Sequence, residues 1–334
     1  MIRFALLGCG RIGRVHADSI DVHPRAELAW VYDPIESAAN EVARQHGASS
    51  ASTVEVAIDD PSVDAVVIAS ATPTHVDLLT RAVRAGKAVL CEKPIDLDLA
   101  RVDQCWTEIA ALNPTIMIGF NRRFDPSFRQ VHNQVAAGDI GRLEQLLIVS
   151  RDPAPASREY LAASGGLFRD MTIHDFDLAR FFLGEIVEVY ATGANVVADF
   201  IAELGDIDSA VVVMRGRDGE LCHITNSRRS VFGYDQRLEA FGATGMLSVG
   251  NQHPTSVRLS NATQTEAAPE YLNFFLDRYT PAYRAELDHL ITAMEQGEQP
   301  VPGFSDGRQA LALADAALES LHAGRSVRLE SQSV

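Results

Sequence analysis

The chain has 334 residues, enough for two domains, because single hydrophobic cores usually stop growing at about 250 to 300 residues. Its composition, 46% hydrophobic and 22% charged, is that of an ordinary globular protein, and no segment reaches the roughly 18 consecutive apolar residues of a membrane span. The net charge of -16 argues against general affinity for nucleic acid or membrane surfaces, which depends on clustered Lys and Arg.

Location and redox state are predicted from the N-terminus and the cysteines. Met1 is followed almost at once by an expected strand, which leaves no room for a secretory signal and predicts a cytoplasmic protein. The four cysteines are widely spaced and form no CxxC pair, so we expect reduced thiols rather than a disulfide framework or a zinc ribbon.

The first 121 residues alternate short β-rich runs with stretches of helical periodicity. The expected strands are residues 3–7, 28–32, 65–69, 88–91 and 115–119. Helical spacing covers residues 35–45 and 74–85. This alternation predicts an α/β domain, residues 1–121, with a doubly wound parallel sheet of the Rossmann type.

The rhythm changes after residue 121. We expect helices at residues 125–137, 170–183, 282–295 and 306–323, and strands within residues 143–152, 185–197, 209–216, 220–229 and 237–243. Successive strands joined by turns predict a mainly antiparallel sheet in a second, α+β domain, residues 122–334.

The stretch LLGCGRIGRVHADSI, residues 6–20, carries a GxGxxG pattern at Gly8, Gly10 and Gly13. It follows an apolar strand and opens a helix, which is the context of a dinucleotide-binding turn. Gly8 would permit the tight turn, Gly10 would leave room for a pyrophosphate, and Gly13 would let helix and strand pack closely. The alternative is a strand-turn-helix without a ligand.

Asp33 ends the second expected strand, twenty residues beyond Gly13. Its carboxylate is suited to hydrogen bonds from the adenosine ribose. Against a 2′-phosphate at about 4 Å it would meet a repulsion on the order of 4 kcal/mol, which favours NAD over NADP. The alternative is that Asp33 only caps its loop.

CEKP, residues 91–94, follows a buried strand at the carboxyl edge of the expected sheet, where ligands bind in such folds. Lys93 could hydrogen-bond a substrate oxygen or exchange a proton there. An ion pair with Glu92 is the alternative, and Pro94 is a candidate for a cis peptide bond.

GGLFRDMTIHDFDLARFFLG, residues 165–184, spaces Asp170, His174 and Asp177 by four and three residues. That spacing puts all three on one face of a helix. His174 could move a substrate proton while a carboxylate holds its tautomer. An exposed ion pair and an Asp-His-Asp metal site are the alternatives, and we expect no metal because further ligands are missing.

Six motifs in order resemble the glucose-fructose oxidoreductase and inositol dehydrogenase family. They are GCGRIGRVHA, ATPTHVDL, GKAVLCEKPI, GFNRRFDPSF, GGLFRDMTIHDFDLARF and FGATGML, and they span essentially the whole chain. The resemblance implies a Rossmann domain with NAD, a C-terminal domain built on a large open sheet, and a homotetramer or dimer. NRRFDPSF with GGLFRDMTIHDFDLARF is most similar to members that oxidise myo-inositol to 2-keto-myo-inositol.

The resemblance also implies roles for individual residues. The catalytic set maps onto Lys93, Asp170 and His174. The expected cofactor-binding residues are Gly8, Gly10, Arg11, Ile12, Gly13, Asp33, Ala71, Thr72, Pro73, His75, Glu92, Lys93 and Arg122. The expected substrate-binding residues are Lys93, Asn121, Asp152, Thr172, His174, Asp177 and Tyr234.

Two alternative functions stay open at this point. The first is an NAD(P)-dependent dehydrogenase of another inositol isomer or sugar, because pocket residues outside the motifs decide the substrate. The second is an NAD-dependent glycoside hydrolase of the same family, in which oxidation is transient and no net NADH accumulates.

Overall fold

The computed structural model describes residues 1–329 and divides into two compact units. The first unit contains Met1–Phe124 and Thr280–Leu311, and the second contains Asp125–Tyr279 and the chain from Ala312 onward. The boundary predicted from the sequence, after residue 121, places residues 280–311 in the second domain. In the structure this segment packs with the first unit.

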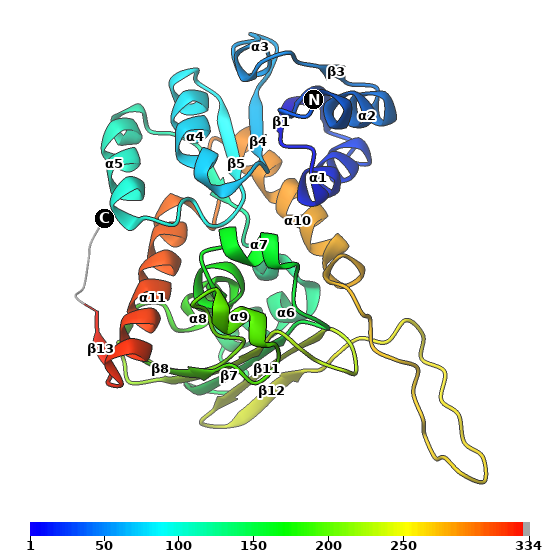
Figure 1. Ribbon diagram of the computed structural model, residues 1–334, viewed down its shortest axis with the longest axis vertical. Helices are drawn as coiled ribbons and strands as arrows, with labels where there is room; N and C mark the ends of the chain where they lie inside the picture. Colours follow the sequence, from blue (N-terminus) through cyan, green and yellow to red (C-terminus); the bar gives the residue numbers. More distant parts are fainter. Residues whose placement is uncertain (330–334) are drawn as a thin grey trace. The chain divides into compact units, whose positions relative to one another are not determined.

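The first unit is built on a parallel sheet, as predicted, which has six strands in the order β3-β2-β1-β4-β5-β6 (Figure 1). Its strands are β1 (Ile2–Leu7), β2 (Ala26–Tyr32), β3 (Ser49–Ser50), β4 (Ala65–Ile68), β5 (Ala88–Cys91) and β6 (Ile116–Ile118). Every residue of β4 and β5 is buried, which is why these strands are uninterrupted apolar runs. The strand order reverses between β1 and β4, and ligands of doubly wound sheets bind at that point.

Helices follow the strands of this sheet in turn. They are α1 (Arg11–Asp21), α2 (Glu36–His46), α3 (Val54–Ile58), α4 (His75–Arg84) and α5 (Leu99–Ile109). Helix α1 lies beside β1 and β2, α2 lies beside β2, and α4 lies beside β4 and β5, with α5 packed beside α4 (Figure 1).

A segment from late in the chain completes the first unit. It includes most of α10 (Phe275–Gln296) and the start of α11 (Phe304–Ala323). The backbone N–H of Ile118 donates to the carbonyl of Pro302 at 2.9 Å. An Arg308 guanidinium nitrogen lies 2.9 Å from the Asp103 carboxylate, so this segment is joined to the sheet edge and to α5.

The second unit is built on a seven-stranded sheet in the order β12-β11-β7-β10-β9-β8-β13. Its strands are β7 (Leu143–Arg151), β8 (Ile186–Ala194), β9 (Ser209–Gly216), β10 (Leu221–Ser227), β11 (Asp235–Gly242), β12 (Gly245–Val249) and β13 (Val327–Arg328). The pairs are antiparallel except for β7 with β10, which run parallel. The expected mainly antiparallel sheet is confirmed.

Helices cover one face of this sheet and bury its apolar side chains. They are α6 (Pro126–Ala137), α8 (Ile173–Leu183) and the second part of α11, whereas α7 (Arg158–Ala163) and α9 (Asp199–Glu203) pack against each other. The core between them includes Leu146, Val212 and Ile224 from alternate strand positions. Between β12 and α10 the chain forms a long hairpin-like arm, yellow in Figure 1, closed by a bridge between Leu259 and Ala267.

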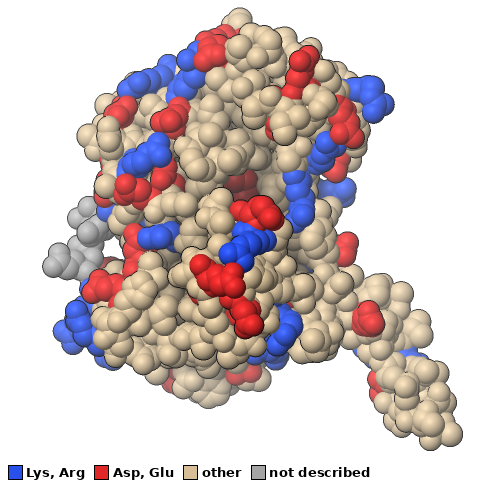
Figure 2. Space-filling view, in the orientation of Figure 1, with Lys and Arg blue, Asp and Glu red and all other residues tan. Residues whose placement is uncertain are grey.

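The distribution of surface charge and the state of the cysteines follow the expectations from the composition. Basic and acidic side chains are interspersed over the face drawn in Figure 2, without a large patch of one sign. Cys9, Cys91, Cys105 and Cys222 are buried thiols. In the part of the chain that the structure describes, no helix is long and apolar enough to cross a membrane.

Candidate active site

The turn after β1 requires glycine at its first position. Gly8 has a φ of +101°, a backbone conformation that residues other than glycine rarely adopt. A Cβ atom on Gly8 would lie 2.6 Å from backbone atoms of Ala69 and Ser70, which follow β4. The turn therefore runs directly against the end of β4, at the point where the strand order reverses.

The other two glycines differ in their surroundings. A Cβ atom on Gly13 would lie 1.9 Å from the Gly8 carbonyl oxygen, so α1 can approach the turn only without a side chain there. Gly10 is exposed and has nothing within 4 Å of its missing Cβ atom. It is the N-cap of α1 and provides no side-chain acceptor for the first N–H groups of the helix. Open space before uncapped N–H groups fits a pyrophosphate.

Asp33 lies beside this turn at the end of β2. One carboxylate oxygen accepts the backbone N–H of Cys9 at 2.8 Å, and the other accepts the N–H of Ile35 at 2.8 Å. The second bond is the loop cap considered in the sequence analysis, whereas the first holds the carboxylate against the glycine turn. Contact of Asp33 with a ribose stays a prediction.

Cys9, between the first two glycines, is a neutral member of the turn. Burial, together with the negative charge of Asp33, raises the pKa of the Cys9 thiol to about 11. The thiol therefore adds no negative charge where a phosphate is expected.

The CEKP segment is fixed by Glu92 after β5. Glu92 is buried, and its carboxylate lies 2.8 Å from Nε2 of His16 and accepts the backbone N–H of Lys93 at 3.3 Å. A Cβ atom on Gly119 would lie 2.9 Å from the Glu92 carboxyl carbon, so glycine is needed there for close packing. The Lys93–Pro94 peptide bond is cis. His16, which lies on α1, was not singled out in the sequence.

His75 joins this segment to the loop after β4. Its ring is buried, with Nδ1 2.8 Å from the Pro94 carbonyl oxygen and Nε2 3.0 Å from the Ser70 carbonyl oxygen. Ala71 and Pro73, on the same loop, are exposed. His75 thus connects the loop after β4 with the CEKP segment. Its direct contact with a cofactor stays a prediction.

Arg11, Ile12, Thr72 and Arg122 are the other expected cofactor-binding residues. Arg11 begins α1 and is exposed, Ile12 and Thr72 are half-buried, and Arg122 is buried in the short 3-10 helix Asn121–Phe124. Asn121 is buried in the same turn. Ligand contacts of all five stay predictions.

In the second unit, Asp170 lies on a π-helical turn. This turn, Phe168–Thr172, leads directly into α8, where His174 is in the first turn. The residue periodicity predicts an ordinary helix from Asp170 and gives no sign of the π turn. Such wide turns often occur at functional sites. Asp170 and His174 are both half-buried.

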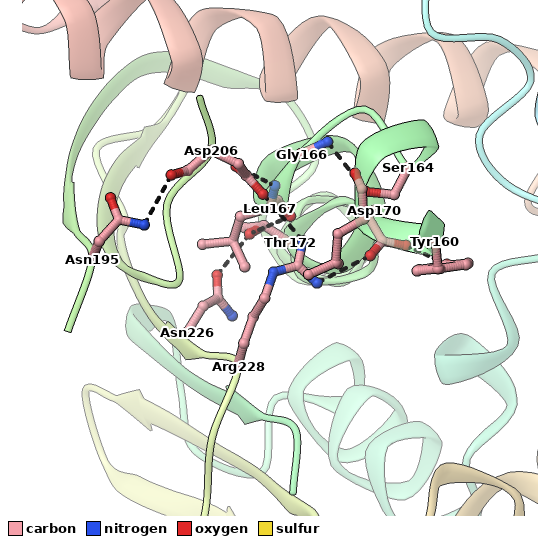
Figure 3. A network of polar contacts seen from close by, with 11 residues as sticks. Tyr160, Ser164, Gly166, Leu167, Asp170, Thr172, Asn195, Asp206, Asn226 and Arg228 are labelled. Atoms are coloured by element: carbon pink, nitrogen blue, oxygen red, sulfur yellow. Dashed lines mark hydrogen bonds and ion pairs between the residues drawn. The ribbon is translucent and has the colours of Figure 1, made fainter. Parts of the chain in front are cut away.

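The Asp170 carboxylate is held by two side chains from other segments (Figure 3). The hydroxyl of Tyr160, on α7, donates to one oxygen at 2.8 Å. Nη1 of Arg228, just after β10, lies 3.2 Å from the other oxygen. Neither residue was singled out in the sequence, although a charged run, NSRR, after an apolar strand could have drawn attention to Arg228.

The expected substrate-binding residues of the second unit have different surroundings. Thr172 is fully buried, and its hydroxyl donates to the Asn226 side chain at 2.8 Å. Asp177 and Tyr234 are also buried, whereas Asp152 is half-buried and follows β7, beside the end of the parallel strand β10. Among residues 1–329, no three His, Cys, Asp or Glu side chains are placed to share a metal ion. Substrate contacts of these four residues stay predictions.

Known protein families match the sequences of both units. Residues 2–120 match the model of an oxidoreductase family with an NAD-binding Rossmann fold, and residues 128–248 match the GFO/IDH/MocA C-terminal domain. An inositol 2-dehydrogenase of Rhizobium meliloti is 44% identical over 98% of this chain and 99% of its own.

Solved structures lead to the same group. A myo-inositol dehydrogenase from Corynebacterium glutamicum has 51% identity and a TM-score of 0.97, covering 99% of this chain and 100% of its own. A scyllo-inositol dehydrogenase from Lactobacillus casei, solved with NAD(H) and scyllo-inositol, has 27% identity and a TM-score of 0.89, covering 98% and 99%.

The glycine turn, the strand order and these matches define an oxidoreductase with an NAD-binding Rossmann domain. The chain belongs to the GFO/IDH/MocA family along its length.

The two single variants Gly10→Ala and Gly13→Ala should have different effects, the first on the affinity for NAD and the second on packing and stability. Gly10→Ala should fold normally but lose affinity for NAD about tenfold or more, because its methyl group enters the open space before α1. Gly13→Ala should lower the unfolding temperature, because its methyl group overlaps the Gly8 carbonyl. Thermal unfolding and calorimetric titration with NAD measure the two effects. Wild-type NAD affinity in Gly10→Ala would contradict the assignment of this turn.

Proposed function

We propose that this protein is an NAD-dependent dehydrogenase of a cyclic polyol, and that it oxidises myo-inositol to 2-keto-myo-inositol. The observation that carries the proposal is the full-length similarity to proteins named inositol 2-dehydrogenase and myo-inositol dehydrogenase, at 44% and 51% identity. The glycine turn and the half-buried pair Asp170 and His174 support it with the chemical groups that such a reaction needs.

Three residues of this chain would carry the chemistry. Bound NAD supplies a hydride acceptor. His174 takes the proton of the substrate hydroxyl whose carbon loses the hydride. Lys93 donates a hydrogen bond to the same oxygen and offsets its developing negative charge. Asp170 orients the base.

The other predicted contacts complete this proposal. Asn121, Asp152, Thr172, Asp177 and Tyr234 would bind the polyol hydroxyls. The first unit would hold the cofactor, and the second would supply most of the substrate contacts.

Replacement of Lys93 or His174 by alanine should lower turnover by about 100-fold or more, because each removes a group acting on the reacting oxygen. The affinity for NAD should stay nearly unchanged. Steady-state rates of NADH formation and calorimetric titration with NAD measure both quantities. Wild-type turnover in either variant would show that the residue has no part in the reaction.

Substrate and cofactor can be tested together with a panel of polyols. We expect NADH formation with myo-inositol and NAD, and much slower turnover with NADP, because the Asp33 carboxylate would repel a 2′-phosphate. The panel includes scyllo-inositol, glucose and a nitrophenyl glycoside, read at the reduced-nicotinamide absorbance and at the nitrophenol absorbance. Preference for scyllo-inositol or a sugar would reassign the substrate, and nitrophenol release without net NADH would indicate the glycoside hydrolase.

We also propose a cytoplasmic homo-oligomer, a tetramer or a dimer. The face of the second sheet opposite its core carries exposed apolar side chains: Tyr190, Val211, Val213, Leu221, Phe241 and Met246. Apolar groups gathered on one face favour association with another protein surface. Buried thiols at all four cysteines are compatible with a reducing compartment.

Val213→Glu should shift the protein to the monomer, because it places a charge in the middle of this apolar face. Size-exclusion chromatography with light scattering gives the molar mass. Val22→Glu, on exposed surface of the first unit, is the matched control and should leave the mass unchanged. An unchanged mass of Val213→Glu would mean that this face is not the interface.

A further inference from the structure

We propose that Arg228 is a positioning residue for the reaction, because it holds the Asp170 carboxylate in place and ties it to Asp206. The inference rests on the proposed function, in which Asp170 orients the base. It adds a residue that acts on the reacting groups only through Asp170.

Arg228 is a buried cation between two carboxylates. Its side chain is 2% exposed, and its backbone N–H donates to the Asp208 carbonyl at 2.8 Å. Nη1 lies 3.2 Å from Asp170 Oδ2, and Nη2 lies 3.5 Å from Asp206 Oδ2. The two nitrogens of one planar fork therefore contact two carboxylates from different segments (Figure 3).

Asp206 connects the same fork to the start of the wide turn. Its Oδ1 accepts the backbone N–H of Leu167 at 3.0 Å. A Cβ atom on Gly166 would lie 2.9 Å from this oxygen, so the chain passes Asp206 closely. Asp206 thus holds the residue before the π turn, while Arg228 holds Asp170 within the turn. The Arg228 guanidinium group therefore contacts the turn directly at Asp170 and, through Asp206, at Leu167.

Tyr160 completes the coordination of Asp170. Its hydroxyl donates to Oδ1, so both carboxylate oxygens have a donor. Burial and the negative charge of Asp170 raise the pKa of the Tyr160 phenol above its usual range, so it remains a donor at working pH. Arg228 is the cation of this network. Without it, the partly buried carboxylates of Asp170 and Asp206 would lose the positive charge that lies 3.2 and 3.5 Å from their oxygens.

A lysine could replace the charge of Arg228 but not its geometry. Its single ammonium group cannot present two nitrogens in a fixed plane to two carboxylates. In the proposed function, the orientation of Asp170 decides how its carboxylate meets His174, which lies four residues further along the chain. A displacement of about 1 Å at such a group can cost about 100-fold in rate.

The test compares Arg228→Gln and Arg228→Lys with the matched control Arg158→Gln in the full-length protein. Arg158 is 51% exposed and pairs with Glu203 at 2.6 Å in the same unit, so its replacement also removes an arginine-carboxylate contact. The measurements are kcat, KM for myo-inositol, affinity for NAD, and the primary deuterium isotope effect with substrate deuterated at the reacting carbon.

We expect Arg228→Gln to lower kcat about 10- to 100-fold, with a larger isotope effect and unchanged affinity for NAD. Arg228→Lys should fall between Arg228→Gln and the wild type, and Arg158→Gln should match the wild type. A merely structural role would lower the unfolding temperature and the fraction of active protein, but leave kcat per folded site and the isotope effect unchanged. That result would overturn the proposal. If Arg228→Gln does not fold, wild-type kcat and isotope effect in Arg228→Lys overturn it equally.

Hydrogen exchange separates this proposal from the proposed function. In the protein without ligands, Arg228→Gln should speed amide exchange across residues 166–172, including the Leu167 N–H that Asp206 accepts. If none of the polyols tested supports NAD reduction by the wild-type protein, the proposed function is refuted. Amide exchange still reports on the turn in that case. Unchanged exchange in Arg228→Gln would show that Arg228 does not hold it.

Discussion

The first unit depends on one close approach between backbones. The start of α1 can meet the turn after β1 only because Gly13 has no side chain to strike the Gly8 carbonyl. The same turn runs against the backbone after β4, where the strand order reverses. These contacts place the open N-terminus of α1, the Asp33 carboxylate and the loop of Ala71 and Pro73 at one edge of the sheet. A dinucleotide site follows from this packing.

Behind that edge, buried polar side chains hold the loops in position. His75 bridges the carbonyl groups of Ser70 and Pro94, and Glu92 connects His16 with the backbone of Lys93. These contacts all join protein groups, and they fix the loops that would contact the cofactor.

The second unit follows the same principle with charges instead of close backbone contacts. Asp170 lies on a wide helical turn, and Tyr160 and Arg228 hold its two oxygens from separate segments. Buried carboxylates and guanidinium groups are costly unless they are paired, and in this network both oxygens of Asp170 have a donor.

The sequence by itself determined the Rossmann unit, the mainly antiparallel second sheet, the glycine turn and the candidates Lys93, Asp170 and His174. Local periodicity, glycine spacing and strand ends carry that information, because each depends on neighbours in the chain. Only the tertiary structure decided that residues 280–311 pack with the first unit, that Asp170 lies on a π turn, and that Tyr160 and Arg228 hold its carboxylate. The packing of residues 280–311 and the pair of Arg228 with Asp170 join residues far apart in the chain, which no local pattern records. The π turn is local, but residue periodicity does not distinguish it from an α-helical turn.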